Sequence, residues 1–352
     1  MNVYRYEENP LITPKDVTPY HEGFEVIGAF NAAVTSFNDE ILLILRVAER
    51  PISPDENTVS APVYDVEEKK VQVVELKKDD PRYDFSDPRV IKHAGTDRFA
   101  YLTSISYLRL ARSKDGRTFT IDEKPLVYPS NIHEIYGIED PRVTKIDDTY
   151  YIYFSAVSPM GIGESMVSTK DFEHFEHHGM IFSPENKDVT IFPEKINGKY
   201  YALHRPVPSS TGKPQVWIAE SENLIHWGNH QFLFGVREGK WDEGRIGASA
   251  VPFKTEKGWL EIYHGADRNS RYCLGAVLFD LNDPTKIIAR SDEPILEPET
   301  DYEISGFFGN VVFSCGALVE GDIVKIYYGV ADEAMACAEL KVSEILDSLT
   351  YL

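Results

Sequence analysis

The chain has 352 residues and a formal net charge of −21, with 42% hydrophobic and 12% aromatic residues. That charge argues against nucleic acid and anionic membranes as partners, because their surfaces would repel the protein, and any anionic substrate needs a local group of cations. The three cysteines, Cys273, Cys315 and Cys337, lie far apart, and we expect free buried thiols rather than a disulfide framework or a metal site. Because no apolar leader or long apolar run is present, we expect a soluble cytoplasmic protein.

Short apolar or alternating runs bounded by Gly, Asp, Asn and Pro follow one another along the chain, which is typical of β-strands. One unit, a strand, a tight polar turn and a second strand, can be laid over the sequence five times. The turns with their second strands are NDEILLILRVAER (38–50), DDTYYIYFSAVSP (147–159), NGKYYALHRPVPS (197–209), EKGWLEIYHGADR (256–268) and EGDIVKIYYGVADEA (320–334).

Radial repetition explains this pattern, because a small sheet cannot bury both of its faces alone and a closed ring of sheets can. We therefore predict an all-β, five-bladed β-propeller that forms a single domain over residues 1–352, with the active site in its central funnel. Residues 51–100 are interpreted as an insertion in the first blade, because a third strand, YLRLARSKDG, follows them. The insertion holds its own Asp-Pro-Arg, in FSDPRVIKH, so a sixth blade is the alternative.

In a propeller, the ends of the inner strands meet at a common funnel. The repeat places Asn31, the pair Glu139 and Asp140, Arg46, His204 with Arg205, His264, Asp267 and Asp332 there. Alternation along a strand predicts that Glu139 and Asp140 point in opposite directions, one into the funnel and one into the blade. The ordinary alternatives are a turn-forming Asp140, a surface salt bridge at Arg205 and a core histidine at His264.

Several long stretches, in order over nearly the whole chain, resemble the mannoside phosphorylases of glycoside hydrolase family 130. They are GIEDPRVTKIDDTYYIYFSA (137–156), NKDVTIFPEKINGKYYALHRP (186–206), GWLEIYHGAD (258–267) and IYYGVADEAMACA (326–338). Their details resemble most the bacterial enzymes that act on β-1,2-mannobiose and short β-1,2-mannooligosaccharides. The resemblance implies a five-bladed propeller, a homo-oligomer (dimer or higher), and reversible, inverting phosphorolysis to α-D-mannose 1-phosphate and mannose. Inorganic phosphate is then the co-substrate, with no metal or organic cofactor.

The resemblance also implies roles for individual residues. Asp140 is the single catalytic acid, and it is expected to have a raised pKa near apolar and tyrosine walls. Phosphate is itself the nucleophile, so no second carboxylate is needed as a base. The implied phosphate-binding residues are Arg46, Lys187, Arg205 and His264, and the implied substrate-binding residues are Asn31, Glu139, His204, Asp267 and Asp332.

Three other functions remain as alternatives. The first is a phosphorylase for another β-mannoside, such as β-1,4-mannosyl-glucose or mannosyl-N-acetylglucosamine. The second is a β-1,2-mannosidase, which would hydrolyse the same linkage. Retention of Lys187, Arg205 and His264 favours phosphorolysis over hydrolysis, because family hydrolases replace these residues. The third, from another class, is a non-catalytic propeller that binds glycan or protein, which would have no need for a cation cluster facing an acid.

Overall fold

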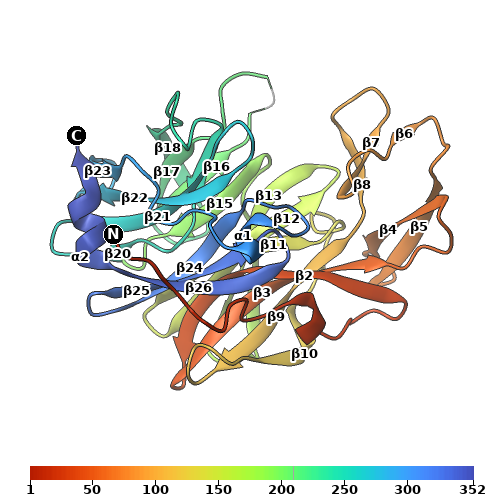
Figure 1. Ribbon diagram of the computed structural model, residues 1–352, viewed down its shortest axis with the longest axis horizontal. Coiled ribbons are helices and arrows are strands. Elements are labelled where there is room, and N and C mark those ends of the chain that lie inside the picture. The colour runs from red at the N-terminus through yellow and green to blue at the C-terminus, as the bar shows by residue number, and fades with distance from the viewer. Residues whose placement is uncertain (209) are drawn as a thin grey trace.

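The computed structural model describes residues 1–208 and 210–352, and its regular secondary structure is almost entirely β-strand (Figure 1). Four four-stranded sheets and one six-stranded sheet hold most of the described strand residues. All three cysteines are free and buried, as the sequence predicted. Among the described residues, no helix is both long and apolar enough to cross a membrane.

The first three sheets each contain four strands. The first has the order β10-β9-β3-β2, with β2 (Phe24–Phe37), β3 (Glu40–Pro51), β9 (Ile105–Ser113) and β10 (Thr120–Val127). The second has the order of the chain, with β11 (Ile138–Ile146), β12 (Thr149–Ser158), β13 (Gly161–Thr169) and β14 (Phe175–Phe182). The third sheet also has its strands in the order of the chain, with β15 (Asn186–Ile191), β16 (Tyr200–Pro206), β17 (Val216–Ser221) and β18 (Trp227–Phe234).

The two ends of the chain complete the last two sheets. The fourth consists of β19 (Arg245–Ala248), β20 (Phe253–Lys254), β21 (Trp259–Ala266), β22 (Tyr272–Phe279), β23 (Ile287–Ser291) and the C-terminal β27 (Leu349–Tyr351). The fifth consists of β24 (Val312–Glu320), β25 (Ile323–Val330), β26 (Ala334–Lys341) and the N-terminal β1 (Tyr4–Arg5). Three short helices lie between strands: η1 (Pro14–Asp16), α1 (Asp301–Ile304) and α2 (Val342–Ser348).

Tight polar turns join the first and second strands of the repeat, as predicted. Two-residue turns are confirmed by the pairing registers at 37–40, 146–149, 196–199 and 320–323. Asn38, Asp147, Asn197 and Gly321 open these turns with φ of 50°, 54°, 51° and 61°. Asn, Asp and Gly adopt positive φ at small cost, and such turns match the twist of the strands they join.

Residues 52–104 leave the first sheet and form two small sheets of their own. One pairs β4 (Thr58–Asp65) with β5 (Lys70–Lys77), and the other contains β6 (Tyr83–Asp84), β7 (Val90–His93) and β8 (Phe99–Leu102). A small apolar core holds them, formed by Ala61, Leu76, Ile91 and Ala100. The chain then returns as β9, which pairs with β3. This insertion projects to the right in Figure 1, away from both termini.

Apolar cores lie between consecutive sheets. Leu108 and Ile152 belong to a core shared by the first and second sheets, and similar cores lie between the second and third, the third and fourth, and the fourth and fifth. A further core, which includes Val34 and Tyr327, joins the fifth sheet to the first. Each sheet therefore buries both faces against its neighbours, which a four-stranded sheet cannot do alone.

Candidate active site

The same β-bulge recurs in the first strands of three sheets. The pairing register shifts after the seventh residue of β2, Phe30, and after the second residue of β11 and β15. In each case the first residue of the bulge has a positive φ: 48° at Asn31, 47° at Asp140 and 54° at Asp188. Asn and Asp tolerate this conformation better than other non-glycine residues. A bulge re-aims its side chain, and here three bulges bring three polar side chains into one cluster.

The carboxylate of Asp140 lies at the centre of this cluster. Its Oδ1 accepts hydrogen bonds from Nδ2 of Asn31 at 2.9 Å and from an Nη of Arg46 at 3.0 Å. The other Nη of Arg46 donates to Oε1 of Glu139 at 2.9 Å. Both carboxylates therefore share one guanidinium, and the prediction that they point in opposite directions is wrong. The positive φ of Asp140 breaks the alternation on which that prediction depended.

The predicted raised pKa of Asp140 is also wrong. Burial acts to raise it, but the positive charges of Arg46, Lys187 and Arg142 and the hydrogen bond from Asn31 outweigh burial and lower the pKa. Asp140 is therefore ionised at neutral pH in this arrangement. Its tertiary surroundings are rich in cations, which the apolar and tyrosine-rich sequence around it does not reveal.

A second group of charges surrounds Asp188. Its Oδ2 forms an ion pair with Arg205 at 2.8 Å and lies 3.3 Å from Nε2 of His264. Its Oδ1 accepts a hydrogen bond from Arg142 at 3.1 Å. Lys187, the neighbour of Asp188, extends toward Glu139 with Nζ 3.8 Å from Oε2. Arg142 links the two groups, because its other Nη donates to the backbone carbonyl of Asp140 at 2.9 Å.

His264 is fully buried within this second group. Its Nδ1 lies 3.0 Å from the Ser249 hydroxyl, and its Nε2 lies 3.3 Å from Arg205. Burial lowers the pKa of His264 more than the charge of Asp188 raises it, so the ring is neutral near pH 7. His264 therefore adds no full positive charge to this group.

Two glycines allow the sheets to approach the cluster closely. A Cβ on Gly329 of β25 would collide with the side chain of Asn31, and a Cβ on Gly247 of β19 would collide with Asp188 and His264. Only a residue without a side chain fits at either position. The fourth and fifth sheets thus complete a site whose charged groups come mainly from the first three.

Some buried polar atoms of the cluster are unpaired. Oδ1 of Asn31 and Nε of Arg205 have no hydrogen-bond partner among the described residues. An unpaired buried polar group costs on the order of 1–3 kcal/mol, and a polar ligand can supply the missing partner. Such atoms are unusual in a folded protein, which marks the cluster as a candidate binding site.

The structure brings most of the predicted site residues together. Asn31, Arg46, Glu139 and Asp140 form one group, and Lys187, Arg205 and His264 form the adjoining one. Burial raises the pKa of Asp332 to about 6. The charges of Arg46, Asp140 and Glu139 also affect this pKa, so Asp332 interacts electrostatically with the first group. Apart from the adjacent pair Glu139 and Asp140, these residues come from different strands or from the turn that follows one, so they meet only in the fold.

Two predicted residues lie elsewhere. His204 stacks on Phe182 at 4.8 Å, and its ring nitrogens lie 3.1 Å from Asn186 and His230. Neighbouring residues of a strand point to opposite faces, so Arg205 reaches the cluster and His204 does not. Asp267 accepts hydrogen bonds from the backbone N–H groups of residues 269 and 271, which is the role of a turn residue.

Sequence reasoning missed Asp188 and Arg142. Asp188 follows Lys187 just as Asp140 follows Glu139, and both sit at the bulge of a first strand. That register match was available in the sequence. Arg142 belongs to the Asp-Pro-Arg motif, but its role depends on contacts with the third and fourth sheets, through Asp188 and the carbonyl of Ala248.

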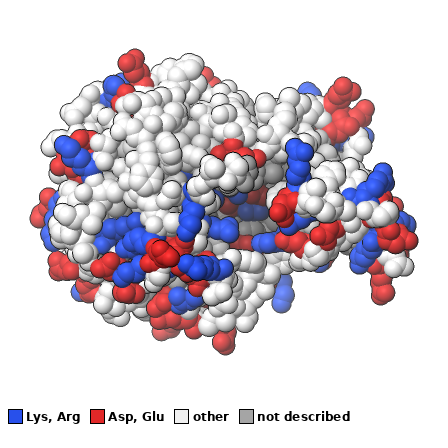
Figure 2. Space-filling view, turned by 90° about the horizontal axis from the view of Figure 1, so that it is seen from above, with Lys and Arg blue, Asp and Glu red and all other residues white. Residues whose placement is uncertain are grey.

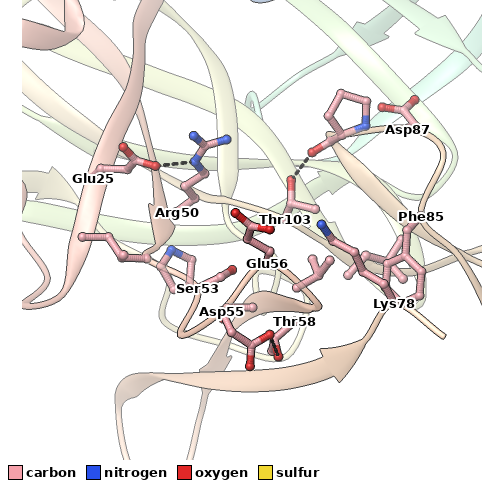
Figure 3. A pocket seen from close by; sticks show the side chains of 16 residues that line it. Glu25, Arg50, Ser53, Asp55, Glu56, Thr58, Lys78, Phe85, Asp87 and Thr103 are labelled. Atoms are coloured by element: carbon pink, nitrogen blue, oxygen red, sulfur yellow. Dashed lines mark hydrogen bonds and ion pairs between the residues drawn. The ribbon is translucent and has the colours of Figure 1, made fainter. Parts of the chain in front are cut away.

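The face of the molecule in Figure 2 is hollowed near its middle, and acidic and basic side chains gather in and around the hollow. A separate cavity of about 560 Å³ lies where the insertion joins the first sheet (Figure 3). Its lining includes Glu25, Arg50, Lys78, Phe85 and Asp87, but none of the predicted site residues. The paired carboxylates and the buried cations, rather than this cavity, define the candidate active site, because they include most of the predicted site residues and are linked by hydrogen bonds and ion pairs.

An acid beside a cluster of cations, carried by five small sheets, is the arrangement of a glycoside-cleaving enzyme that uses phosphate. The family model for glycoside hydrolase family 130, described as β-1,4-mannooligosaccharide phosphorylase, matches residues 102–351. The chain belongs to this family.

Particular relatives refine the comparison. The chain is 58% identical to the β-1,2-mannobiose phosphorylase of Listeria innocua, over 99% of both chains. The solved structure of that Listeria enzyme in complex with β-1,2-mannobiose superposes with a TM-score of 0.97, again over 99% of both chains. A 1,2-β-oligomannan phosphorylase of Thermoanaerobacter is 42% identical over 68% of this chain and 80% of its own. The β-1,4-mannooligosaccharide phosphorylase of Ruminococcus albus is 32% identical over 67% of this chain and 73% of its own.

Proposed function

We propose that this protein is an inverting phosphorylase of β-1,2-mannobiose and short β-1,2-mannooligosaccharides. It transfers the terminal mannosyl unit to inorganic phosphate, giving α-D-mannose 1-phosphate and mannose or a shortened chain, and the reaction is reversible. The observation that carries the proposal is the 58% identity to a β-1,2-mannobiose phosphorylase over 99% of both chains. The carboxylate of Asp140 and the adjoining cations support the proposal, because phosphorolysis needs an acid and a group that binds phosphate.

The fold proposed for this function is a five-bladed propeller. Five sheets are joined by apolar cores between neighbours, and one of those cores lies between the fifth sheet and the first. We interpret the five sheets as blades, the site as the centre of their funnel, and residues 1–352 as a single domain with an insertion at about 51–100. In this arrangement the first strands of all blades face one another, which explains why their bulges share one cluster.

Asp140 is the proposed catalytic acid, and Lys187, Arg205 and His264 are proposed to hold phosphate, with Arg46 beside them. Phosphate is a charged nucleophile and needs no base, but it has to be desolvated and aimed at the anomeric carbon. Charge-assisted hydrogen bonds from lysine and arginine serve this purpose despite the net charge of −21. Three of the remaining residues of the cluster are proposed to bind sugar hydroxyls: Asn31, Glu139 and Asp332.

The low pKa of Asp140 suits this reaction. A phosphate dianion near Lys187 and Arg205 offsets positive charge that lowers the pKa of Asp140, so its affinity for a proton rises when phosphate binds. Overall, the C1–O bond of the mannoside breaks and a C1–O bond to phosphate forms. The proton that hydrogen phosphate gives up ends on the leaving sugar oxygen, and Asp140 relays it. Acid catalysis thus depends on the co-substrate being present.

We propose a β-1,2 rather than a β-1,4 linkage for the substrate of this chain. The family model carries a β-1,4 description, but it represents the whole family and matches only residues 102–351. The β-1,2 enzyme matches the entire chain at 58% identity, whereas the β-1,4 enzyme is 32% identical over two thirds of it. The longer and closer match is the better guide to the substrate.

The test is incubation with β-1,2-mannobiose with and without phosphate, followed by identification of the products by NMR. We expect α-mannose 1-phosphate and mannose in phosphate and no cleavage without it. Equal release of mannose in both buffers would instead support a β-1,2-mannosidase. Cleavage of β-1,4-mannosyl-glucose in preference to mannobiose would assign another mannoside. Light scattering on the same preparation gives the mass of the protein in solution and so tests the proposed homo-oligomer.

A further inference from the structure

The insertion carries two turns of the same sequence and the same local structure. Asp80-Pro81-Arg82 and Asp87-Pro88-Arg89 each fold so that the aspartate accepts a backbone hydrogen bond from the arginine two residues later. In each turn the guanidinium also hydrogen-bonds to that aspartate through Nε and one Nη. Two matched arginines are therefore presented on rigid turns of one insertion.

The two arginines differ in what lies around them. The Arg82 side chain is 73% exposed and stacks only on its neighbour Tyr83, at 5.3 Å. Arg89 instead lies 4.7 Å from the ring of Phe308, which follows α1 and precedes the fifth sheet. Hydrogen bonds to Asp87 raise the pKa of Arg89, and the charge of Asp332 adds to the rise. Arg89 thus reaches from the insertion to the edge of the candidate active site.

The turn that carries Arg89 is firmly held. The Thr103 hydroxyl donates a hydrogen bond of 2.7 Å to the carbonyl of Pro88, which Figure 3 shows beside Asp87. Asp87 fixes the Nε and one Nη of the guanidinium, at 3.1 and 3.0 Å. The remaining Nη makes no hydrogen bond within the described residues, and the side chain is 44% exposed. A donor fixed in this way is suited to bind the hydroxyl of a ligand, because little side-chain entropy is lost.

The side of the site on which Arg89 lies indicates which sugar it contacts. Of the proposed phosphate-binding residues, Lys187, Arg205 and His264 come from the third and fourth sheets and Arg46 from the first. Arg89 instead packs on Phe308, whose backbone N–H donates to the carbonyl of Ala331, the residue before Asp332 at the end of the fifth sheet's second strand. In an inverting displacement, the nucleophile and the leaving group lie on opposite faces of the sugar that is transferred. The Arg89 side is then the side of the leaving group.

We propose that Arg89 is a specificity-determining residue that hydrogen-bonds the leaving-group sugar, so that the insertion forms one wall of the acceptor subsite. This inference rests on the proposed phosphorolysis. It also gives the insertion a function, because Arg89 lies on the turn between its strands β6 and β7. Acceptor choice is therefore assigned in part to this insertion.

The test compares Arg89→Met with the matched control Arg82→Met in the synthetic direction, with α-mannose 1-phosphate as donor and mannose as acceptor. Loss of a hydrogen bond from a charged group is expected to raise KM for mannose roughly 10- to 100-fold in Arg89→Met. KM for mannose 1-phosphate should stay near the wild-type value in both variants. Arg82→Met should behave as wild type throughout, and Arg89→Lys should recover part of the affinity.

Melting temperatures of both variants check that the insertion remains folded. Equal KM values for mannose in Arg89→Met and Arg82→Met would overturn the inference while leaving the proposed function intact. An equal rise in KM for donor and acceptor would also overturn it, because a merely structural role would disturb both. A wild-type protein that forms no mannoside from mannose 1-phosphate would overturn the proposed function itself, and the inference with it.

Discussion

Replacing Arg205 by methionine tests the proposed phosphate site most directly. The substitution keeps most of the apolar stem and removes the guanidinium, which pairs with Asp188 at 2.8 Å and lies 3.3 Å from Nε2 of His264. Nε of Arg205 is buried and unpaired among the described residues, so a bound phosphate can satisfy it. The variant therefore removes donors to phosphate without removing any proposed sugar contact.

The expected magnitude follows from the number and kind of bonds lost. A hydrogen bond to a charged group contributes roughly 1.5–3 kcal/mol, and each 1.4 kcal/mol is about a tenfold change in affinity. KM for phosphate should therefore rise about 10- to 100-fold in Arg205→Met, whereas KM for β-1,2-mannobiose should change little. Initial rates of mannose 1-phosphate formation, with each substrate varied in turn, separate the two constants.

Arg290 provides the matched control. Arg205 and Arg290 are both 8% exposed, and each pairs with a buried aspartate, at 2.8 Å for Asp188 and 2.6 Å for Asp242. Arg290→Met should lower the melting temperature in the same way but leave KM for phosphate unchanged. The reasoning is refuted if Arg205→Met retains the wild-type KM for phosphate, or if both variants raise it equally.

Three further predictions concern the acid, a buried glutamate and a glycine. Asp140→Asn keeps a residue that tolerates the φ of 47° and should fold normally, but it should lose roughly 10²- to 10⁴-fold in kcat, as measured on mannobiose. Burial raises the pKa of Glu164 to about 8 from its usual 4.5, so Glu164 takes up a proton on folding between these pH values. Stability from this group is full below pH 4.5 and is lost as pH rises to 8. The free energy of unfolding, measured with denaturant, should therefore fall less between pH 4.5 and 8 in Glu164→Gln than in the wild type, by on the order of 4 kcal/mol. Gly247→Ala should raise KM for phosphate and lower the melting temperature, because its Cβ would collide with Asp188.

Each of these predictions has a control. An aryl β-mannoside whose leaving group needs no proton should be cleaved by Asp140→Asn far better than mannobiose is, and equal losses on both substrates would contradict the acid role. Glu176 is exposed on the same sheet as Glu164, so Glu176→Gln should keep the wild-type decline of stability with pH. No atom would lie within 4 Å of a Cβ at Gly228, so a Gly228→Ala variant as impaired as Gly247→Ala would show that crowding is not the cause.

The sequence determined the repeat and most of the chemistry. Turn residues such as Asn197 and Gly198 have strong local preferences, and alternating strands follow them at a regular spacing, so both could be predicted without tertiary information. Arg46, Arg205 and His264 sit at matching positions of the second strands, and Asp140 sits near the same end of a first strand. Because each repeat folds in the same way, matching positions meet in space, and the prediction that these residues share a site needed only the register.

Tertiary structure decided the directions and the charges of the side chains. The bulges at Asn31, Asp140 and Asp188 turn side chains that strand alternation would send elsewhere, and a bulge depends on how two strands pair rather than on local preference. The pKa of Asp140 depends on Arg46 and Lys187, which come from other sheets. Arg89 reaches Phe308 across more than two hundred residues of chain. Electrostatic and stacking interactions act through space, so these properties became visible only when the sheets were assembled.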